Sequence, residues 1–256
     1  MIVININPAV LTVGSFKVGW GLIMALAAGI VALLLFVVLA RRAGLQKRHV
    51  IWIWLLTVVS GYIGALLFSF IENLIVYHDT VINFGVRADG LPIAAMIAML
   101  IYARITKLSF WQLLDIGTPC LILFMAVYRI GCVLVGCCYS LPCDQPWAVM
   151  YNSPNSPAPL GTPIYPTQFF HLIWNVIVLA MVWLLRKRFK AQGELGLTGW
   201  ILYFLGDFVI RFFRGNEPPV LGLSLSELTD LIAIVAAVYL LILRFKTRVQ
   251  KEVVDN

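Results

Sequence analysis

Two arginines, Arg129 and Arg214, have side chains suited to holding a phosphate, and each follows a long apolar run of the sequence. A guanidinium group offers paired donors that match two phosphate oxygens, and it keeps its charge when it is partly buried. The pair therefore favours a site for an anionic substrate. The simpler alternative is that both side chains extend to lipid head groups.

The cysteines form a second group with chemical potential. Four of them have the spacing C-x4-C-C-x4-C, while Cys120 stands apart; the four are Cys132, Cys137, Cys138 and Cys143. This is not a standard zinc spacing and the segment lacks a histidine, so we expect no metal site. Three interpretations stay open: a disulfide between Cys138 and Cys143 on an oxidising face, a catalytic thiol, and small packing residues.

Several titratable residues lie in or next to apolar runs. His171 has two interpretations, a general base and a hydrogen-bonded residue at a helix contact. Asp207 and Arg211 are four residues apart, which places them on one helix face where they can pair. Charges inside a membrane are costly and often mark functional sites, but a structural ion pair explains these two as well. Glu227 and Asp230 follow serines at a helix start, where capping explains them as well as a catalytic role does.

The composition defines the setting of these side chains. Of the 256 residues, 61% are hydrophobic and only 12% are charged, against about 25% charged in soluble domains. Runs of roughly 20 apolar residues span a bilayer, and only a helix satisfies its own backbone there. We therefore predict an all-α polytopic membrane protein, a single transmembrane domain over residues 1–256. The expected spans, of which the third is short, are Trp20–Ala40, Val50–Tyr77, Leu91–Tyr102, Trp111–Tyr128, Phe169–Leu185, Thr198–Phe213 and Ser224–Leu243.

The net charge of +7 comes from short basic clusters between apolar runs. Most of the 19 basic residues lie in alternate loops, at 41–48, 104–107, 186–190 and 244–251. This is the topology pattern of a membrane protein, so a nucleic-acid partner is not expected. The positive-inside rule predicts an outer N-terminus and a cytoplasmic C-terminus. The segment 129–167, rich in Pro, Asn and Ser, is then an irregular excursion on the outer face.

The segment 128–139, YRIGCVLVGCCY, resembles the signature of prolipoprotein diacylglyceryl transferases, in the branch with a Gly-Cys-Cys-Tyr ending. Three further stretches resemble family motifs in the same order. They are YPTQFF at 165–170, the stretch from Tyr203 to Arg214-Gly215-Asn216, and LSLS at 223–226. The similarity covers nearly the whole chain, and the predicted topology is that of the family. The order of the motifs carries the resemblance, because no single motif is decisive.

The resemblance implies an enzyme that moves a diacylglyceryl group from phosphatidylglycerol to the thiol of a lipobox cysteine. The reaction takes place on the outer face of the bacterial cytoplasmic (inner) membrane and requires no metal or organic cofactor. Arg129 and Arg214 match the functional arginines of the family and would hold the leaving phosphate. The other residues that the resemblance assigns to substrate binding are Gly131, Gly136, Tyr165, Gln168, Arg87 and Asp89.

The sequence also departs from the family. Ala88 stands where a histidine or tyrosine is usual, Cys132 and Val135 replace asparagines, and Trp20 replaces a tyrosine. The proton of the acceptor thiol must then go to another group. Three residues are candidates for that base, namely His171, Tyr139 and Asp89. The alternatives to the standard reaction are a related lipid transferase with a different acceptor or donor, and a non-catalytic lipid-binding protein of the same family.

Overall fold

The computed structural model describes residues 1–13, 16–76, 78, 87–214, 218–220 and 222–254. Within them the chain forms seven α-helices and four short strands. The helices are α1 Trp20–Arg42, α2 Lys47–Val76, α3 Gly90–Thr106, α4 Phe110–Val135, α5 Thr167–Leu185, α6 Glu194–Arg211 and α7 Leu225–Val254. Five of these helices are long and apolar enough to cross a membrane, namely α1, α2, α4, α5 and α7. The predicted class of all-α polytopic membrane protein is confirmed.

Each expected span corresponds to one helix, with shifted ends. The shifted end that matters most for the site is that of α4. This helix continues past the expected end at Tyr128 to Val135, so Arg129 lies within its last two turns. The irregular segment after it therefore starts at Gly136 and not at Arg129. The expected end of the second span, Tyr77, and the motif residues Gly215 and Asn216 lie outside the described residues.

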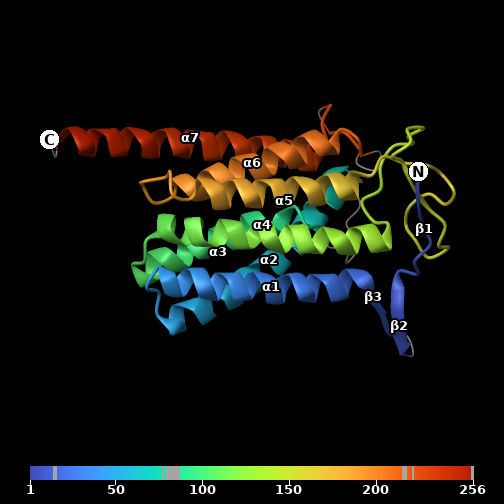
Figure 1. Cartoon of the computed structure of the whole chain (residues 1–256), viewed down its shortest axis with the longest axis horizontal. Helices are drawn as coiled ribbons and strands as arrows, with labels where there is room; N and C mark the ends of the chain where they lie inside the picture. Colours follow the sequence, from blue (N-terminus) through green and yellow to red (C-terminus); the bar gives the residue numbers. More distant parts are fainter. Residues whose placement is uncertain (14–15, 77, 79–86, 215–217, 221, 255–256) are drawn as a thin grey trace.

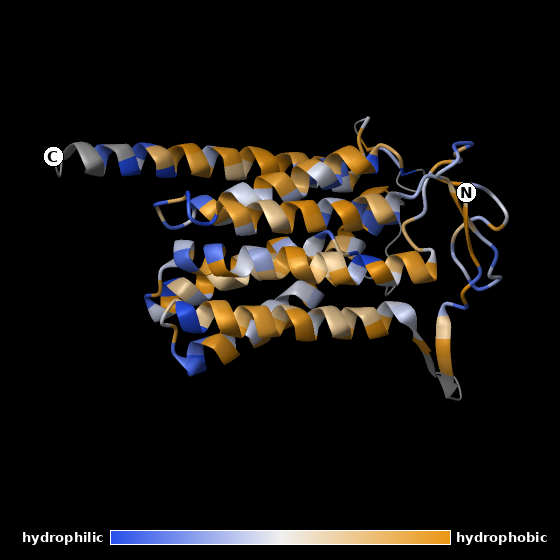
Figure 2. Ribbon diagram, in the orientation of Figure 1, coloured by the Kyte–Doolittle hydropathy of each residue, from blue (hydrophilic) through white to orange (hydrophobic). Residues whose placement is uncertain are grey.

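The helices run side by side, with the N-terminus and the segment between α4 and α5 at one end and the C-terminus at the other (Figure 1). Apolar residues cover the middle of the helices, and hydrophilic segments gather at the end that carries the C-terminus (Figure 2). The outward face of α1 is apolar, with Leu26, Ile30 and Leu34 each about 60% exposed. A row of exposed leucine and isoleucine at i, i+4, i+8 spacing is stable when the solvent is lipid.

Small residues allow the helices to approach closely. A Cβ atom on Gly64 of α2 would lie 2.3 Å from Ala94 Cβ and 2.5 Å from the Gly90 carbonyl oxygen of α3. A Cβ on Gly206 of α6 would meet the Trp174 ring of α5 at 1.8 Å. Close contact between backbones is a main source of helix association in membranes, because lipid provides no hydrophobic drive between helices.

At the end with the C-terminus, polar groups fix the start of α6. The Asp115 carboxylate of α4 accepts hydrogen bonds of 2.7 Å from the backbone N–H groups of Gly193 and Gly196. Glu194, which is fully buried, is paired with Arg248 of α7 at 2.9 Å. The two bonds to Asp115 satisfy backbone donors that have no partner within the helix itself.

At the opposite end, short strands cover the helices. Strand β1 (Ile2–Ile4) pairs in parallel with β4 (Val149–Tyr151), and β2 (Ala9–Val13) pairs antiparallel with β3 (Phe16–Gly19). The strands β1 and β4 and the segment after them enclose a small apolar cluster that includes Ile4, Val149 and Ile164. This second core holds the long segment after α4 against the ends of α4 and α5.

Candidate active site

Asp207 of α6 joins side chains from two neighbouring helices. Its Oδ1 atom lies 2.9 Å from His171 Nδ1 of α5 and 3.5 Å from Arg129 Nη2 of α4. All three residues are at most 4% exposed. Because the carboxylate can only accept, Nδ1 of the imidazole donates, and the lone pair of neutral His171 is then on Nε2. The site therefore contains an imidazole whose tautomer is set by a buried carboxylate.

Arg211 is surrounded by three carboxylates. Its guanidinium is 3.0 Å from Asp207 Oδ2 through Nε and 2.9 Å from Asp230 of α7, and it is also ion-paired with Asp89, the N-cap residue of α3. The predicted pairing of Asp207 with Arg211 is confirmed. A buried charge without partners is very costly, so this network holds α3, α6 and α7 in fixed positions.

Among the buried polar atoms of the described residues that have no hydrogen-bond partner, three belong to this site: Arg129 Nε, His171 Nε2 and Gln168 Oε1. Gln168 is three residues before His171 on the same face of α5, and Arg129 and His171 share Asp207. Buried polar atoms are nearly always satisfied in proteins. Three such atoms around one point indicate a place for a polar ligand.

The chain turns directly after α4. Gly136 ends the helix with φ +79°, and Cys138 also has a positive φ of +56°. A Cβ on Gly136 would be 2.2 Å from Ser156 Oγ and 2.9 Å from the Tyr151 ring. Only glycine fits there, which accounts for this residue of the motif in terms of backbone conformation.

This turn places Cys138 beside Arg129, one of the two predicted phosphate-binding arginines. Arg129 Nη1 lies 3.9 Å from Cys138 Sγ. Hydrogen bonds from the Cys132 and Cys137 thiols lower the pKa of Cys138 well below its ordinary value, and the charges of Arg214 and Arg129 lower it further. The hydrogen bonds that the Cys137 thiol makes with Cys132 and Cys138 in turn raise the pKa of Cys137. Arg129 and Arg214 thus act on the same small region although they are far apart in the sequence.

The remaining predicted residues have the following positions. Gln168 donates from Nε2 to the Cys137 carbonyl oxygen at 2.9 Å, and Tyr165 packs its ring on Phe213, 5.2 Å between centroids. Tyr139 packs against the apolar cluster around Val149. Two residues make other contacts: Gly131 lets α1 approach α4, because its Cβ would be 3.0 Å from Met24 Cβ, and Arg87 forms a two-pronged ion pair with Glu72 at 2.5 and 2.6 Å.

Two features were not predicted from the sequence. The first is the partnership of Asp207 with His171, which joins different helices and leaves no spacing signal. The second is the approach of Cys132, Cys137 and Cys138 to one another, for which the glycine at position 136 between them was an available clue. All five cysteines are free thiols, so the disulfide considered between Cys138 and Cys143 is not formed.

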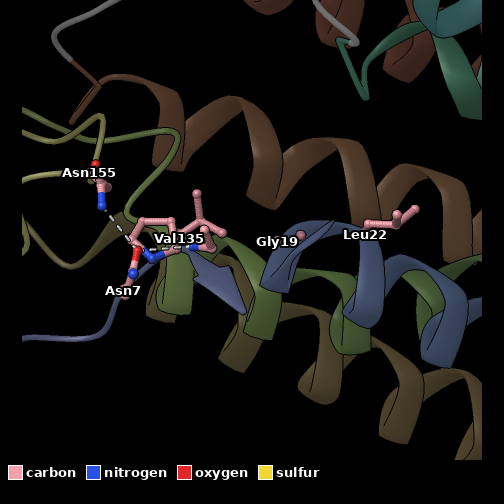
Figure 3. A pocket seen from close by; sticks show the side chains of 8 residues that line it. Asn7, Gly19, Leu22, Val135 and Asn155 are labelled. Atoms are coloured by element: carbon pink, nitrogen blue, oxygen red, sulfur yellow. Dashed lines mark hydrogen bonds between the residues drawn. The ribbon is translucent and has the colours of Figure 1, made fainter. Parts of the chain in front are cut away.

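A hollow lies beside the turn at Gly136, between the N-terminal segment around Asn7 and the start of α1. Its volume is about 510 Å³, and Asn7, Gly19, Leu22, Val135 and Asn155 are among the lining residues. The side chains of Asn7 and Asn155 face each other and share a hydrogen bond of 3.2 Å (Figure 3). Val135 is next to Gly136, so the hollow adjoins the turn that carries the thiols.

Comparisons with known proteins point to one family. The profile of the prolipoprotein diacylglyceryl transferase family matches residues 8–243. A phosphatidylglycerol–prolipoprotein diacylglyceryl transferase of Dehalococcoides mccartyi is 32% identical and covers 100% of both chains. A protein of the same name from Thermosynechococcus vestitus is 30% identical over 88% of both chains. Another from Listeria monocytogenes is 26% identical over 93% of this chain and 90% of its own length.

Proposed function

Because the chain belongs to the prolipoprotein diacylglyceryl transferase family, we propose that it moves the diacylglyceryl group of phosphatidylglycerol to the cysteine thiol of a prolipoprotein. The observation that supports this activity best is the group of unpartnered polar atoms on Arg129, His171 and Gln168. They lie at the end of the helices beside Cys138, where both arginines act. A phosphate would accept from the Arg129 donor, and the S–H group of an adjacent thiol would donate to one of the two acceptors, His171 Nε2 or Gln168 Oε1.

The reaction needs a cation at the leaving group. The acceptor sulfur forms a bond to the glyceryl carbon, the C–O bond to phosphate breaks, and its electron pair leaves on glycerol phosphate. In this proposal Arg129 and Arg214 neutralise that charge as it develops. Arg129 is oriented for this task by Asp207 and keeps an N–H free for the ligand.

The proton of the acceptor thiol goes to His171. Asp89 is ion-paired with Arg211, and Tyr139 packs in an apolar cluster, so both have other contacts. His171 has its Nδ1 atom on Asp207 and its Nε2 atom available. Among the three candidates for the base it therefore has the geometry of a general base, which compensates for Ala88.

The orientation in the membrane follows the charge distribution. All seven helices cross the bilayer of the bacterial cytoplasmic membrane, including the shorter α3 and the more polar α6. The basic residues gather at the end with the C-terminus, for example Arg41 and Arg42 at the end of α1 and Arg104 at the end of α3. That end is cytoplasmic, so the N-terminus and the site lie on the outer face.

The test uses purified protein in micelles of phosphatidylglycerol with a peptide that carries a lipobox cysteine. We expect release of glycerol phosphate in step with a diacylglyceryl mass gain on the peptide. Arg129→Gln should abolish both signals, while Arg104→Gln, at the opposite end of the molecule, should retain them. Release without a mass gain would instead indicate a different acceptor. Full activity of a folded Arg129→Gln protein would exclude the proposed phosphate site.

A further inference from the structure

Gln168 has an atom to which the proposed reaction gives no task. The residue lies in the first turn of α5 and is fully buried. Among the described residues its Oε1 atom has no hydrogen-bond partner. An amide oxygen can only accept a hydrogen bond, and a buried acceptor without a donor costs free energy. The site therefore has a place for a donor group at Gln168.

The orientation of this amide is fixed at its other end. Gln168 Nε2 donates to the Cys137 carbonyl oxygen at 2.9 Å. If the amide were turned over, two oxygens would face each other, so Oε1 has to be the atom that is left unpaired. Thr167 holds the same turn of the chain by donating to the Cys138 carbonyl oxygen at 3.3 Å. Gln168 thus offers an acceptor that is positioned before a ligand binds.

The unpaired atoms define what the ligand has to supply. Arg129 Nε is a donor and suits a phosphate oxygen, whereas His171 Nε2 and Gln168 Oε1 are acceptors. In the proposed reaction the acceptor thiol gives its only proton to His171. Gln168 Oε1 then still needs a donor, which an ionised phosphodiester does not have. The hydroxyl groups on the head group of phosphatidylglycerol are donors of the required kind.

The depths of these residues match the order of groups along a phospholipid. Helices α4 and α5 lie side by side (Figure 1). Gln168 is bonded to Cys137, just past the end of α4, whereas Arg129 is six residues before Val135 and about 9 Å deeper along the helix. His171 is three residues after Gln168 and so roughly 4.5 Å deeper along α5. A phospholipid likewise has its glyceryl carbon and phosphate deeper than its head group.

The nearby charge favours a neutral donor over a cationic one. Gln168 is bonded to Cys137, and the next residue, Cys138, has its Sγ atom 3.9 Å from Arg129 Nη1. An ammonium head group would bring a second positive charge close to this guanidinium, in a buried region where charges are weakly screened. A hydroxyl group donates a hydrogen bond without adding charge. The surroundings therefore suit a hydroxyl group better than an amine.

We propose that Gln168 selects the donor lipid by accepting a hydrogen bond from a hydroxyl group of its head group. This inference rests on the transferase function given above and names the part of the donor that Gln168 recognises. A head group without a hydroxyl leaves the buried Oε1 atom unpaired, so it binds less tightly and reacts more slowly. Gln168 takes part in no bond change. It contributes to the choice and the orientation of the donor.

The first test compares two anionic donors in the transfer assay. Phosphatidylpropanol has the charge and the three-carbon head group of phosphatidylglycerol but lacks its hydroxyl groups. We expect kcat/KM of the parent protein to be about 10–100-fold higher with phosphatidylglycerol. Gln168→Leu should bring this ratio close to one. Thr167→Val is the matched control, because it removes a side-chain bond to the same turn and leaves the acceptor atom in place, so the ratio should persist.

The second test measures binding without turnover. Glycerol phosphate and n-propyl phosphate have the same charge and differ in their hydroxyl groups. In detergent solution, calorimetry should show about tenfold tighter binding of glycerol phosphate by the parent protein and equal binding of both compounds by Gln168→Leu. Gel filtration and thermal unfolding check that each variant is folded. Gln168→Asn, which withdraws the amide by one carbon, takes the place of Gln168→Leu if that variant does not fold.

Three results would overturn the proposal. The first is equal use of both donors by the parent protein, and the second is the same preference in the parent and Gln168→Leu. The third is loss of the preference in Thr167→Val as well, which would assign it to the turn and not to the acceptor atom. A Gln168→Leu protein that keeps the donor preference but binds the lipobox peptide less tightly would assign Oε1 to the peptide.

The two tests also separate this inference from the transferase function. Equal transfer from both donors would refute the role of Gln168 and leave the transferase function standing. A preference for glycerol phosphate that disappears in Gln168→Leu, in a protein that transfers nothing from phosphatidylglycerol, would refute the transferase function and leave the recognition of the head group standing.

Discussion

Arg129 combines two roles that are usually separate. It is only 4% exposed, and its guanidinium is shared between Asp207 on one side and Cys138 on the other. A cation at this depth depends on a fixed counter-charge, because removing it from water costs several kcal/mol. Asp207 therefore stabilises the fold and at the same time aims Arg129 and His171.

The first residue-scale prediction concerns the shape of this cation. Lysine in Arg129→Lys keeps the charge but has no planar fork, so it cannot bind Asp207 and a phosphate together. We expect kcat to fall by about 10²–10³-fold, the effect of losing one preorganised donor. The measurement is steady-state transfer, with Arg104→Lys as the control. Retention of full kcat would show that charge alone is sufficient.

The second residue-scale prediction concerns His171 and Asp207, which we expect to act as one unit. His171→Gln removes the base, and Asp207→Asn removes the negative charge and turns one of the two acceptor oxygens into a donor, so the imidazole tautomer is no longer fixed. Each should lower kcat by about 10²–10⁴-fold, and the double variant should be no worse than the more impaired single variant. A double-mutant cycle in kcat measures this. Additive losses would mean that the two residues act independently. His171→Gln keeps the test valid if Asp207→Asn fails to fold.

Sequence reasoning identified some of these residues and missed others for a physical reason. The pairing of Asp207 with Arg211 follows from helical periodicity, since i and i+4 share a face. The contact of His171 with Asp207 crosses from α5 to α6, and its existence depends on how those helices are rotated. Nothing local in the sequence specifies that rotation, which packing such as Gly206 against Trp174 determines.

At the scale of elements, the crossing of α2 and α3 positions a charge of the site. Gly64 and Gly90 are in direct contact at this crossing, and Asp89, which pairs with Arg211, immediately precedes Gly90. A change in the distance between these helices therefore moves a carboxylate of the network. Helix packing and site electrostatics are connected through this one residue.

We accordingly expect Gly64→Ala to destabilise the protein by about 1–3 kcal/mol, the usual cost of overpacking. The added Cβ would meet backbone and Cβ atoms that side-chain rotation cannot displace. Gly29→Ala is the control, since no atom lies within 4 Å of its Cβ position. Unfolding in mixed micelles compares the two variants with the parent. Equal stability of all three would show that α2 and α3 separate without cost.

Helix positions were predictable because the bilayer imposes length and apolarity, whereas helix ends were not. The extension of α4 to Val135 depends on Gly136, whose positive φ terminates the helix after Arg129 has already been included. Of the two residues explained by capping at the start of α7, Glu227 is confirmed, because Ser224 and Glu227 bond each other's backbone N–H groups at 3.2 and 2.6 Å. For Asp230 the capping interpretation is wrong, since its carboxylate pairs with Arg211 at 2.9 Å. Local capping rules therefore predict where a helix starts. They do not predict the path of the chain after a helix ends.

At the scale of the whole molecule, the distribution of charge predicts its orientation. Protein in spheroplasts should expose an N-terminal epitope tag to antibody, and a C-terminal tag should become accessible only in inverted vesicles. Arg41, Arg42 and Arg104 at the C-terminal end are the reason. The check is tag accessibility on both sides, with a known cytoplasmic protein as the permeability control. Access to both tags from outside would contradict seven crossings.

The charges of α6 also have a consequence for biogenesis. The helix is not among those apolar enough to cross a membrane by composition, and it carries Asp207 and Arg211. Each such residue costs about 2.5–3.5 kcal/mol when a lone helix leaves the translocon for lipid. Their partners are on α3, α4, α5 and α7, and Asp230 is synthesised after α6. With all seven helices crossing the bilayer as proposed, we expect release of α6 from the insertion machinery to wait for α7, so that the two helices enter the bilayer as a pair.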